Sequence, residues 1–190
     1  MRRLNKLKLG FLVAVLSVAL LPVQFVLAGE EQRAPPEART SGTLGPAVMR
    51  AISEIQEMMQ PEDEEEEPDL EGAKIALDEL RERRFERMND FEKSTLLNFY
   101  TNYYLNKEDY PGAIGIFQEM LEIETLRADI RLRTHRSLGQ LYASEENWEG
   151  SIENYEEWRR LSETEDEVVF RGLSYAHYQL ENFEEAKPYW

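Results

Sequence analysis

Few side chains in this sequence are of the types and spacings that perform catalysis. Its two histidines, His135 and His177, lie 42 residues apart at different phases of the helical pattern. Cysteine is absent, which excludes disulfides, thiolate zinc sites and cysteine nucleophiles. Glutamates occur throughout, so no pair stands out as a general acid and base, and there is no glycine-rich phosphate loop. We expect a protein that is not an enzyme and needs no cofactor or metal.

Both histidines fit structural roles better than ligand roles. His177 takes a position at which the other repeats carry a tyrosine that packs between helices, so we expect it to be buried and hydrogen-bonded. His135 is expected at the surface or between repeats. The tyrosines and tryptophans recur at helical spacing, which favours core packing over stacking on a ligand.

The charge balance narrows the partners further. The 190 residues carry a net charge of −16, with 42% hydrophobic and 32% charged residues, which suggests one folded domain with extensions. Such a charge repels nucleic acid, so no nucleic-acid partner is expected. No small-molecule substrate is expected either.

Residues 1–28 have the pattern of a signal peptide. Arg2, Arg3, Lys6 and Lys8 precede an uncharged apolar stretch, and Val26-Leu27-Ala28 suits signal peptidase cleavage after Ala28. An uncleaved membrane anchor is the alternative. Cleavage would change the net charge from −16 to −20, because the segment holds four basic residues and no acidic one. We expect an exported protein of the periplasm.

The remaining chain reads as a linker followed by paired helices. Residues 29–45 are rich in Glu, Pro, Ser, Thr and Gly and predict a flexible linker. Apolar residues at spacings of three and four predict helices over Pro46–Met59 and Leu70–Arg84, a degenerate helical pair within residues 46–85. The acidic run at 61–69 between them predicts a solvated loop, since it lacks the alternating ligands and the glycine of a calcium loop.

Three similar phrases follow at nearly constant spacing. Aligned on Ala113, Ser151 and Ala186, they lie 38 and 35 residues apart. Each small residue has an aromatic three positions before it and another four positions after it. Small residues let paired helices cross closely, and aromatics fill the space beside the crossing. The residues assigned to this packing are Tyr110, Ala113, Phe117, Gly139, Tyr142, Trp148, Ser151, Tyr155, Ser174, Phe183 and Ala186.

This period and pattern resemble the tetratricopeptide (TPR) family. The resemblance implies an all-α solenoid of antiparallel helix pairs stacked in a right-handed superhelix, with three repeats at about 94–127, 132–165 and 167–190. The last repeat ends at Trp190 in mid-helix, so we expect the natural chain to continue. An unrelated helical bundle is the alternative.

In TPR proteins the first helix of each repeat lines a concave groove. Carried over by register, the resemblance implies that this face holds Asn98, Asn102, Arg133, Arg136, Gln140, Arg171, Tyr175 and Tyr178. Arginines of fixed geometry suit carboxylates, although these three could instead pair with acidic neighbours. The lysines of the carboxylate-clamp subfamily are missing. Charge reversal at Arg136 and Arg171 is expected to abolish partner binding without unfolding the chain.

A finer resemblance covers roughly residues 46–190. The sequence there resembles the exported TPR proteins that accompany TonB-type energy-transducing systems of marine gammaproteobacteria. The residues that carry this likeness are Trp158, Glu165-Asp166 and Tyr178-Gln179-Leu180. That likeness implies a periplasmic scaffold whose protein partners are TonB- or ExbD-like domains. Two alternatives stay open, namely a scaffold for envelope, polysaccharide or peptidoglycan assembly, and an accessory repeat region of a longer enzyme.

Overall fold

A computed structural model describes residues 42–63, 65–162 and 164–189. Within these ranges the chain is helical and contains no strand, which confirms the all-α prediction for the described residues. The predicted signal peptide, 1–28, and residues 29–41 of the predicted linker lie outside them. The helices are α1 (Pro46–Met59), α2 (Leu70–Arg84), α3 (Asp90–Asn106), α4 (Tyr110–Leu121), α5 (Ala128–Ser144), α6 (Trp148–Leu161), α7 (Glu167–Gln179) and α8 (Phe183–Ala186).

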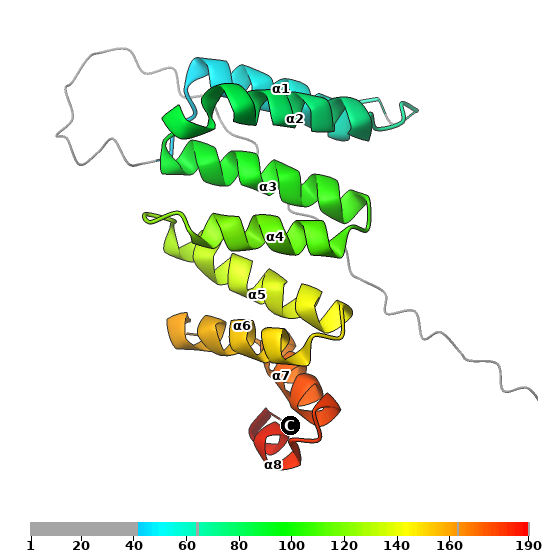
Figure 1. Cartoon of the computed structure of the whole chain (residues 1–190), viewed down its shortest axis with the longest axis vertical. Helices are drawn as coiled ribbons and strands as arrows, with labels where there is room; N and C mark the ends of the chain where they lie inside the picture. Colours follow the sequence, from blue (N-terminus) through cyan, green and yellow to red (C-terminus); the bar gives the residue numbers. More distant parts are fainter. Residues whose placement is uncertain (1–41, 64, 163, 190) are drawn as a thin grey trace, which may run out of the picture. The chain divides into compact units, whose positions relative to one another are not determined.

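Each helix packs against the next one along the chain, so that α1 to α8 follow one another in order (Figure 1). In addition α1 contacts α3, and α5 contacts α7. Short 3-10 helices follow α2, at Phe85–Arg87, and α8, at Lys187–Tyr189. Among the described residues, no helix has both the length and the apolar character required to cross a membrane.

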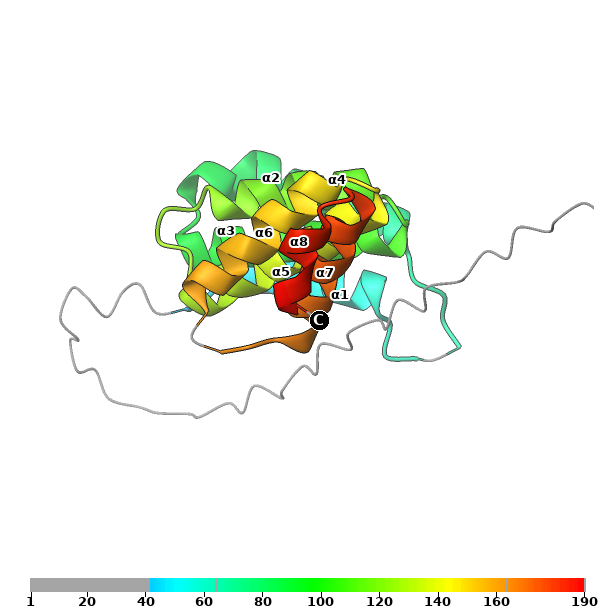
Figure 2. The same cartoon turned by 90° about the horizontal axis from the view of Figure 1, so that it is seen from below.

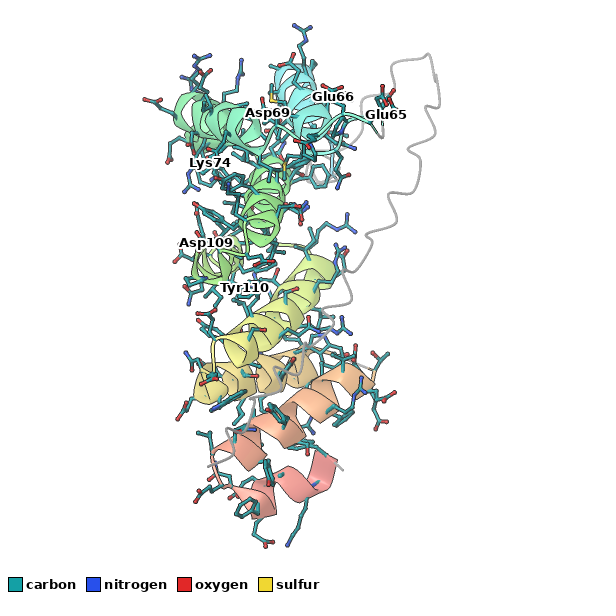
Figure 3. All side chains as sticks on the ribbon, turned by 90° about the vertical axis from the view of Figure 1, so that its right-hand side faces the viewer. Glu65, Glu66, Asp69, Lys74, Asp109 and Tyr110 are labelled. Atoms are coloured by element: carbon teal, nitrogen blue, oxygen red, sulfur yellow. The ribbon has the colours of Figure 1, made fainter. Side chains whose placement is uncertain are left out.

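The first helical pair has the bounds that the sequence predicts. α1 and α2 bury one apolar stripe each, with Ile55 and Leu77 fully shielded from water. The acidic loop between the helices is solvent-exposed over most of its described residues, as its composition predicts. Asp69 ends the loop and caps α2, because its carboxylate accepts a hydrogen bond of 2.8 Å from Gly72 N (Figure 3).

Polar contacts join this pair to the helices that follow. Arg81 Nη2 on α2 donates to Glu119 Oε1 on α4 at 2.6 Å. Tyr100 on α3 donates from its hydroxyl to Asp78 Oδ1 at 2.8 Å. Burial, together with this hydrogen bond, raises the pKa of Tyr100, so the phenol stays a donor at neutral pH.

Two helices begin earlier than the repeat pattern predicts. α3 starts at Asp90 rather than near 94, and α5 starts at Ala128 rather than near 132. At α3 the reason is a capping box. Asn89 Oδ1 accepts from Glu92 N at 2.9 Å, and Glu92 Oε2 accepts from Asn89 N at 3.0 Å. These bonds satisfy free amides of the first turn, which lie before the first apolar residue of the stripe.

The turns α3–α4, α5–α6 and α7–α8 have one geometry, repeated at intervals of 38 and 35 residues. In each, the N-cap residue of the next helix donates its amide to a carbonyl five positions back, namely Asp109 to Tyr104, Asn147 to Tyr142, and Asn182 to His177, at 2.8–2.9 Å. The residue before it bonds three positions back. These two backbone hydrogen bonds together form the Schellman motif, which ends a helix and reverses the chain.

A glutamate occupies the left-handed position of all three turns. Glu108, Glu146 and Glu181 have φ values of 55°, 57° and 61°, in the region that usually favours glycine. All three side chains are exposed. The backbone therefore holds an unfavourable conformation for a residue with a Cβ, and the packing of the paired helices maintains it.

We predict that Glu146→Gly stabilises the protein by about 1 kcal/mol, because glycine removes the steric cost of positive φ. Chemical denaturation followed by circular dichroism would measure the change. The matched control is Glu145→Gly one residue earlier, where φ is −89°. There glycine relieves no strain and should lower stability by roughly 0.5 kcal/mol. Equal effects of the two substitutions would contradict this account.

Candidate functional site

The ring of Tyr155 on α6 lies between two glycines on the helices on either side of it. A Cβ placed on Gly139 of α5 would lie 2.6 Å from Cδ1 and Cε1 of that ring, and one placed on Gly172 of α7 would overlap its opposite edge. Tyr155 is 2% exposed. Burial raises the pKa of the Tyr155 hydroxyl to about 12, so the side chain stays neutral at physiological pH. The stability that the buried neutral phenol contributes is therefore lost only as the pH rises from about 10 toward 12.

The three small residues that aligned the repeats are all fully buried. Ala113, Ser151 and Ala186 have no exposed surface. Ser151 adds a direct bond between helices, because its Oγ donates to Gly139 O at 2.8 Å across the α5–α6 crossing. The small side chain therefore allows backbone-level contact where a larger one would separate the helices.

The other residues assigned to repeat packing divide into two groups. Tyr110, Phe117, Tyr142, Trp148 and Ser174 are partly buried. Phe183 is 48% exposed and meets Tyr178 edge-on, with ring centroids 5.6 Å apart. Phe183 is therefore not interior among the described residues, where only the short 3-10 helix Lys187–Tyr189 follows α8. Gly172 makes a close contact with Tyr155, although the repeat alignment did not select this glycine.

All eight residues assigned to the groove keep some contact with solvent. Asn98, Arg133, Gln140, Arg171, Tyr175 and Tyr178 are exposed, and Asn102 is partly exposed. They lie on α3, α5 and α7, the first helices of the successive pairs. On α7 the three residues share one stripe, since they are separated by four and three positions. Such a surface can bind through amides, guanidinium groups and aromatic faces.

Arg136 is the least exposed of the three arginines in this set. Its side chain is 24% exposed, and Nε lies 2.9 Å from Asp166 Oδ2. The Nε–H bond does not point at that oxygen, so this contact is an ion pair without an aligned hydrogen bond. Asp166 also caps α7 by accepting from Val168 N at 2.8 Å. Arg136 therefore has an acidic neighbour at the start of α7, which is the alternative that the sequence left open for the three arginines.

The other two arginines also have acidic partners, but these pairs are exposed. Arg133 Nη2 lies 3.4 Å from Asp129, and Arg171 Nη1 lies 3.7 Å from Glu167. Both arginine side chains are about 70% exposed. Pairs of this kind contribute little to stability and exchange readily for another partner.

The two histidines have separate surroundings. His135 Nδ1 lies 3.1 Å from Asn154 Oδ1 on α6, which places it between the paired helices. His177 stacks on Tyr189 with ring centroids 6.0 Å apart. Its Nδ1 is buried and has no hydrogen-bond partner among the described residues, so the hydrogen bond expected of His177 is not found there. Within the described part of the chain, no group of three His, Asp or Glu side chains is arranged to hold a metal.

The acidic loop borders a shallow hollow. Its lining consists of Met58, Pro61 and the carboxylates of Glu54, Glu57, Glu66, Glu67 and Asp69. Glu66 and Asp69 are labelled at this end of the molecule in Figure 3. The carboxylates come from α1 and from the loop, so the hollow is a solvated acidic surface.

Comparison with known protein families, with curated proteins and with solved structures gave no match to this chain.

We predict that Gly172→Ala destabilises the protein by about 1–3 kcal/mol, because the added methyl group overlaps the Tyr155 ring between two packed helices. The control is Gly115→Ala in α4, where an added Cβ meets no atom within 4 Å. Alanine there should be neutral or stabilising by up to about 1 kcal/mol, since glycine is a poor helix former. Urea unfolding of both variants would measure the difference, and equal losses would contradict the assigned contact.

Charge reversal should separate the two arginines. Arg136→Glu sets a second carboxylate against Asp166 and should cost about 2 kcal/mol, a value reduced for partial exposure. Arg171→Glu is expected to change stability by less than about 0.5 kcal/mol, because that side chain is exposed. Thermal and urea unfolding would measure both. A folded, fully stable Arg136→Glu variant would show that the ion pair does not hold α7.

Proposed function

We propose that this chain is an exported tetratricopeptide-repeat protein that binds other proteins and is not an enzyme. The observation that carries the proposal is the repetition of one turn geometry at intervals of 38 and 35 residues. The buried Ala113, Ser151 and Ala186 recur at the same intervals. Helix pairs with a period close to 34 residues and small residues at their crossing are typical of this family.

The packing between pairs supports the same proposal. A helical hairpin of this size cannot bury its apolar face alone, and stacking of successive hairpins completes the core. Tyr155 belongs to one pair and its ring meets Gly172 of the next, so adjacent pairs are held directly. α1 contacts α3, and α5 contacts α7, as expected for first helices that lie beside one another along a solenoid. The pair α1–α2 then serves as the degenerate N-terminal repeat.

Binding would use the exposed stripe of the first helices. A stripe fixed on packed helices loses little conformational entropy when a partner docks, so more of the contact energy appears as affinity. Asn98, Gln140 and Tyr175 offer amide and aromatic contacts on three successive first helices. The polar, sequence-reading character of such contacts suits a polypeptide segment better than a metabolite.

The proposed compartment is the periplasm. It rests on the signal-peptide pattern of residues 1–28, and on the resemblance to TPR proteins that accompany TonB-type systems. On this proposal the partners are TonB- or ExbD-like periplasmic domains, and the protein supports an energy-transducing uptake system. Scaffolding of envelope assembly and service as an accessory region of a longer enzyme remain the alternatives.

Site-specific photo-crosslinking in Gram-negative cells tests this proposal. A photoreactive residue replacing Gln140 on the exposed stripe of α5 should crosslink to a TonB- or ExbD-like domain, identified by mass spectrometry. The control replaces Glu153, which is exposed on α6, and should not crosslink to that domain. The crosslinked protein should begin at Gly29. Cytoplasmic protein that retains residues 1–28, or equal crosslinking from both positions, would refute the proposal.

A further inference from the structure

Four aromatic side chains form an exposed strip across α6, α7 and α8. Tyr175, Tyr178 and Phe183 are 49%, 57% and 48% exposed, and Trp148 is partly exposed. Trp148 meets Tyr175 edge-on at 5.5 Å between ring centroids, and Tyr178 meets Phe183 in the same way at 5.6 Å. Soluble proteins rarely leave several large aromatic residues together in water without a partner.

The strip is continuous because its two halves meet on one helix. Tyr175 and Tyr178 are three positions apart on α7, which makes them neighbours on its surface. Trp148 extends the strip to the first turn of α6, and Phe183 extends it to α8. In Figure 2, α7 and α8 lie at the end of the described helices that is nearest the viewer. No described helix covers this strip.

Carboxylates border the aromatic strip. Glu145, Glu146 and Glu149 lie within three positions of Trp148 in the sequence, and Glu181 and Glu185 lie within three positions of Phe183; all five are exposed. None of them forms an ion pair with another described residue. The cations closest in sequence each have an exposed acidic neighbour, since Arg171 lies 3.7 Å from Glu167 and Lys187 lies 2.6 Å from Glu184, so these two pairs add no net charge. The border of the strip is therefore strongly negative.

We propose that this strip binds a polypeptide segment rich in arginine or lysine. Tyrosine and tryptophan faces attract guanidinium and ammonium groups through their ring quadrupoles. The alkyl stems of these side chains cover apolar ring surface, while the surrounding carboxylates complement their charge. This proposal names the chemistry of the partner and rests on the protein-binding function proposed above.

A second copy of this chain is a poor occupant of the strip. The chain carries a net charge of −16, and a symmetric contact would bring the five bordering carboxylates of each copy together. Like charges placed opposite one another across an interface disfavour association. Charge complementarity therefore selects a basic partner segment.

Fluorescence anisotropy of the full chain with a labelled peptide of alternating arginine and alanine tests the proposal. The peptide should bind, and its affinity should fall as the salt concentration increases, whereas a matched glutamate–alanine peptide should not bind. The Tyr175→Ala, Tyr178→Ala double variant should bind the basic peptide about tenfold more weakly. The Tyr175→Phe, Tyr178→Phe variant retains both ring faces and should bind within about twofold of the wild type.

The control is Ile75→Ala, which removes an exposed apolar side chain that is 62% exposed on α2 and should leave peptide binding unchanged. Circular dichroism would verify that every variant is folded. Equal binding by the wild type and the double alanine variant would overturn the proposal, since the peptide would then bind acidic surface elsewhere. A dimer that the double variant abolishes, seen by light scattering, would also overturn it by making a second copy the occupant.

The crosslinking at Gln140 separates this proposal from the broader one. TonB- or ExbD-like domains could crosslink at Gln140 while the basic peptide binds the wild type and the double alanine variant equally. In that case the protein-binding function stands and the proposed chemistry of the partner fails. If neither result is obtained, both proposals fail.

Discussion

The insertion of one tyrosine ring between two glycines governs how the helical pairs meet. Tyr155 belongs to α6, yet its two edges touch the backbone surfaces of α5 at Gly139 and α7 at Gly172. No side chain larger than hydrogen fits at either position without moving the ring. Ser151 sets the approach of α6 to α5 from the same crossing, through its bond to Gly139 O. The spacing and orientation of three helices thus depend on a few steric contacts rather than on general hydrophobicity.

The ion pair of Arg136 and Asp166 affects which charged groups remain exposed on the stripe of the first helices. Burial is the main cause of the raised pKa of Tyr155, and the charges of Arg136 and Asp166 act on that pKa in opposite directions. By neutralising Arg136 and capping α7, the pair leaves Arg133 and Arg171 as the exposed guanidinium groups of the stripe. The accessible character of this face is consequently set by amides and aromatic rings, and its electrostatics are set by the glutamates of the neighbouring turns.

Features that depend on local spacing could be predicted from the sequence. The apolar stripes predict the bounds of α1 and α2, and the aligned phrases predict which small residues are buried. Contacts between different pairs could not be predicted in this way. The alignment compares each position with its counterpart in another repeat, so it selects Ser174 as the equivalent of Gly139. It contains no information that Gly172 faces the ring of the preceding pair.

The candidate site shows the same division. Helical phase correctly separates the exposed stripe of α7 from its buried side, because both lie on one element. The partner of Arg136 comes from the segment that connects α6 to α7, and its position depends on how that connection folds. The left-handed glutamates were also missed, since residue preferences alone favour glycine or asparagine at such turns. In each case the deciding interaction comes from tertiary packing.

The packing of each helix against its successor also bears on how the molecule comes apart. Interactions between near neighbours in sequence give a low contact order, which favours rapid folding because little loop-closure entropy is lost before contacts form. In such an array each helix pair is held mainly by its neighbours, so local opening depends on how much of a helix those neighbours bury. Amide hydrogen exchange should then form a gradient, with slow exchange around Tyr155 and Leu97 and faster exchange in α8. The aromatic strip on α7 and α8 would gain protection from exchange when it is occupied.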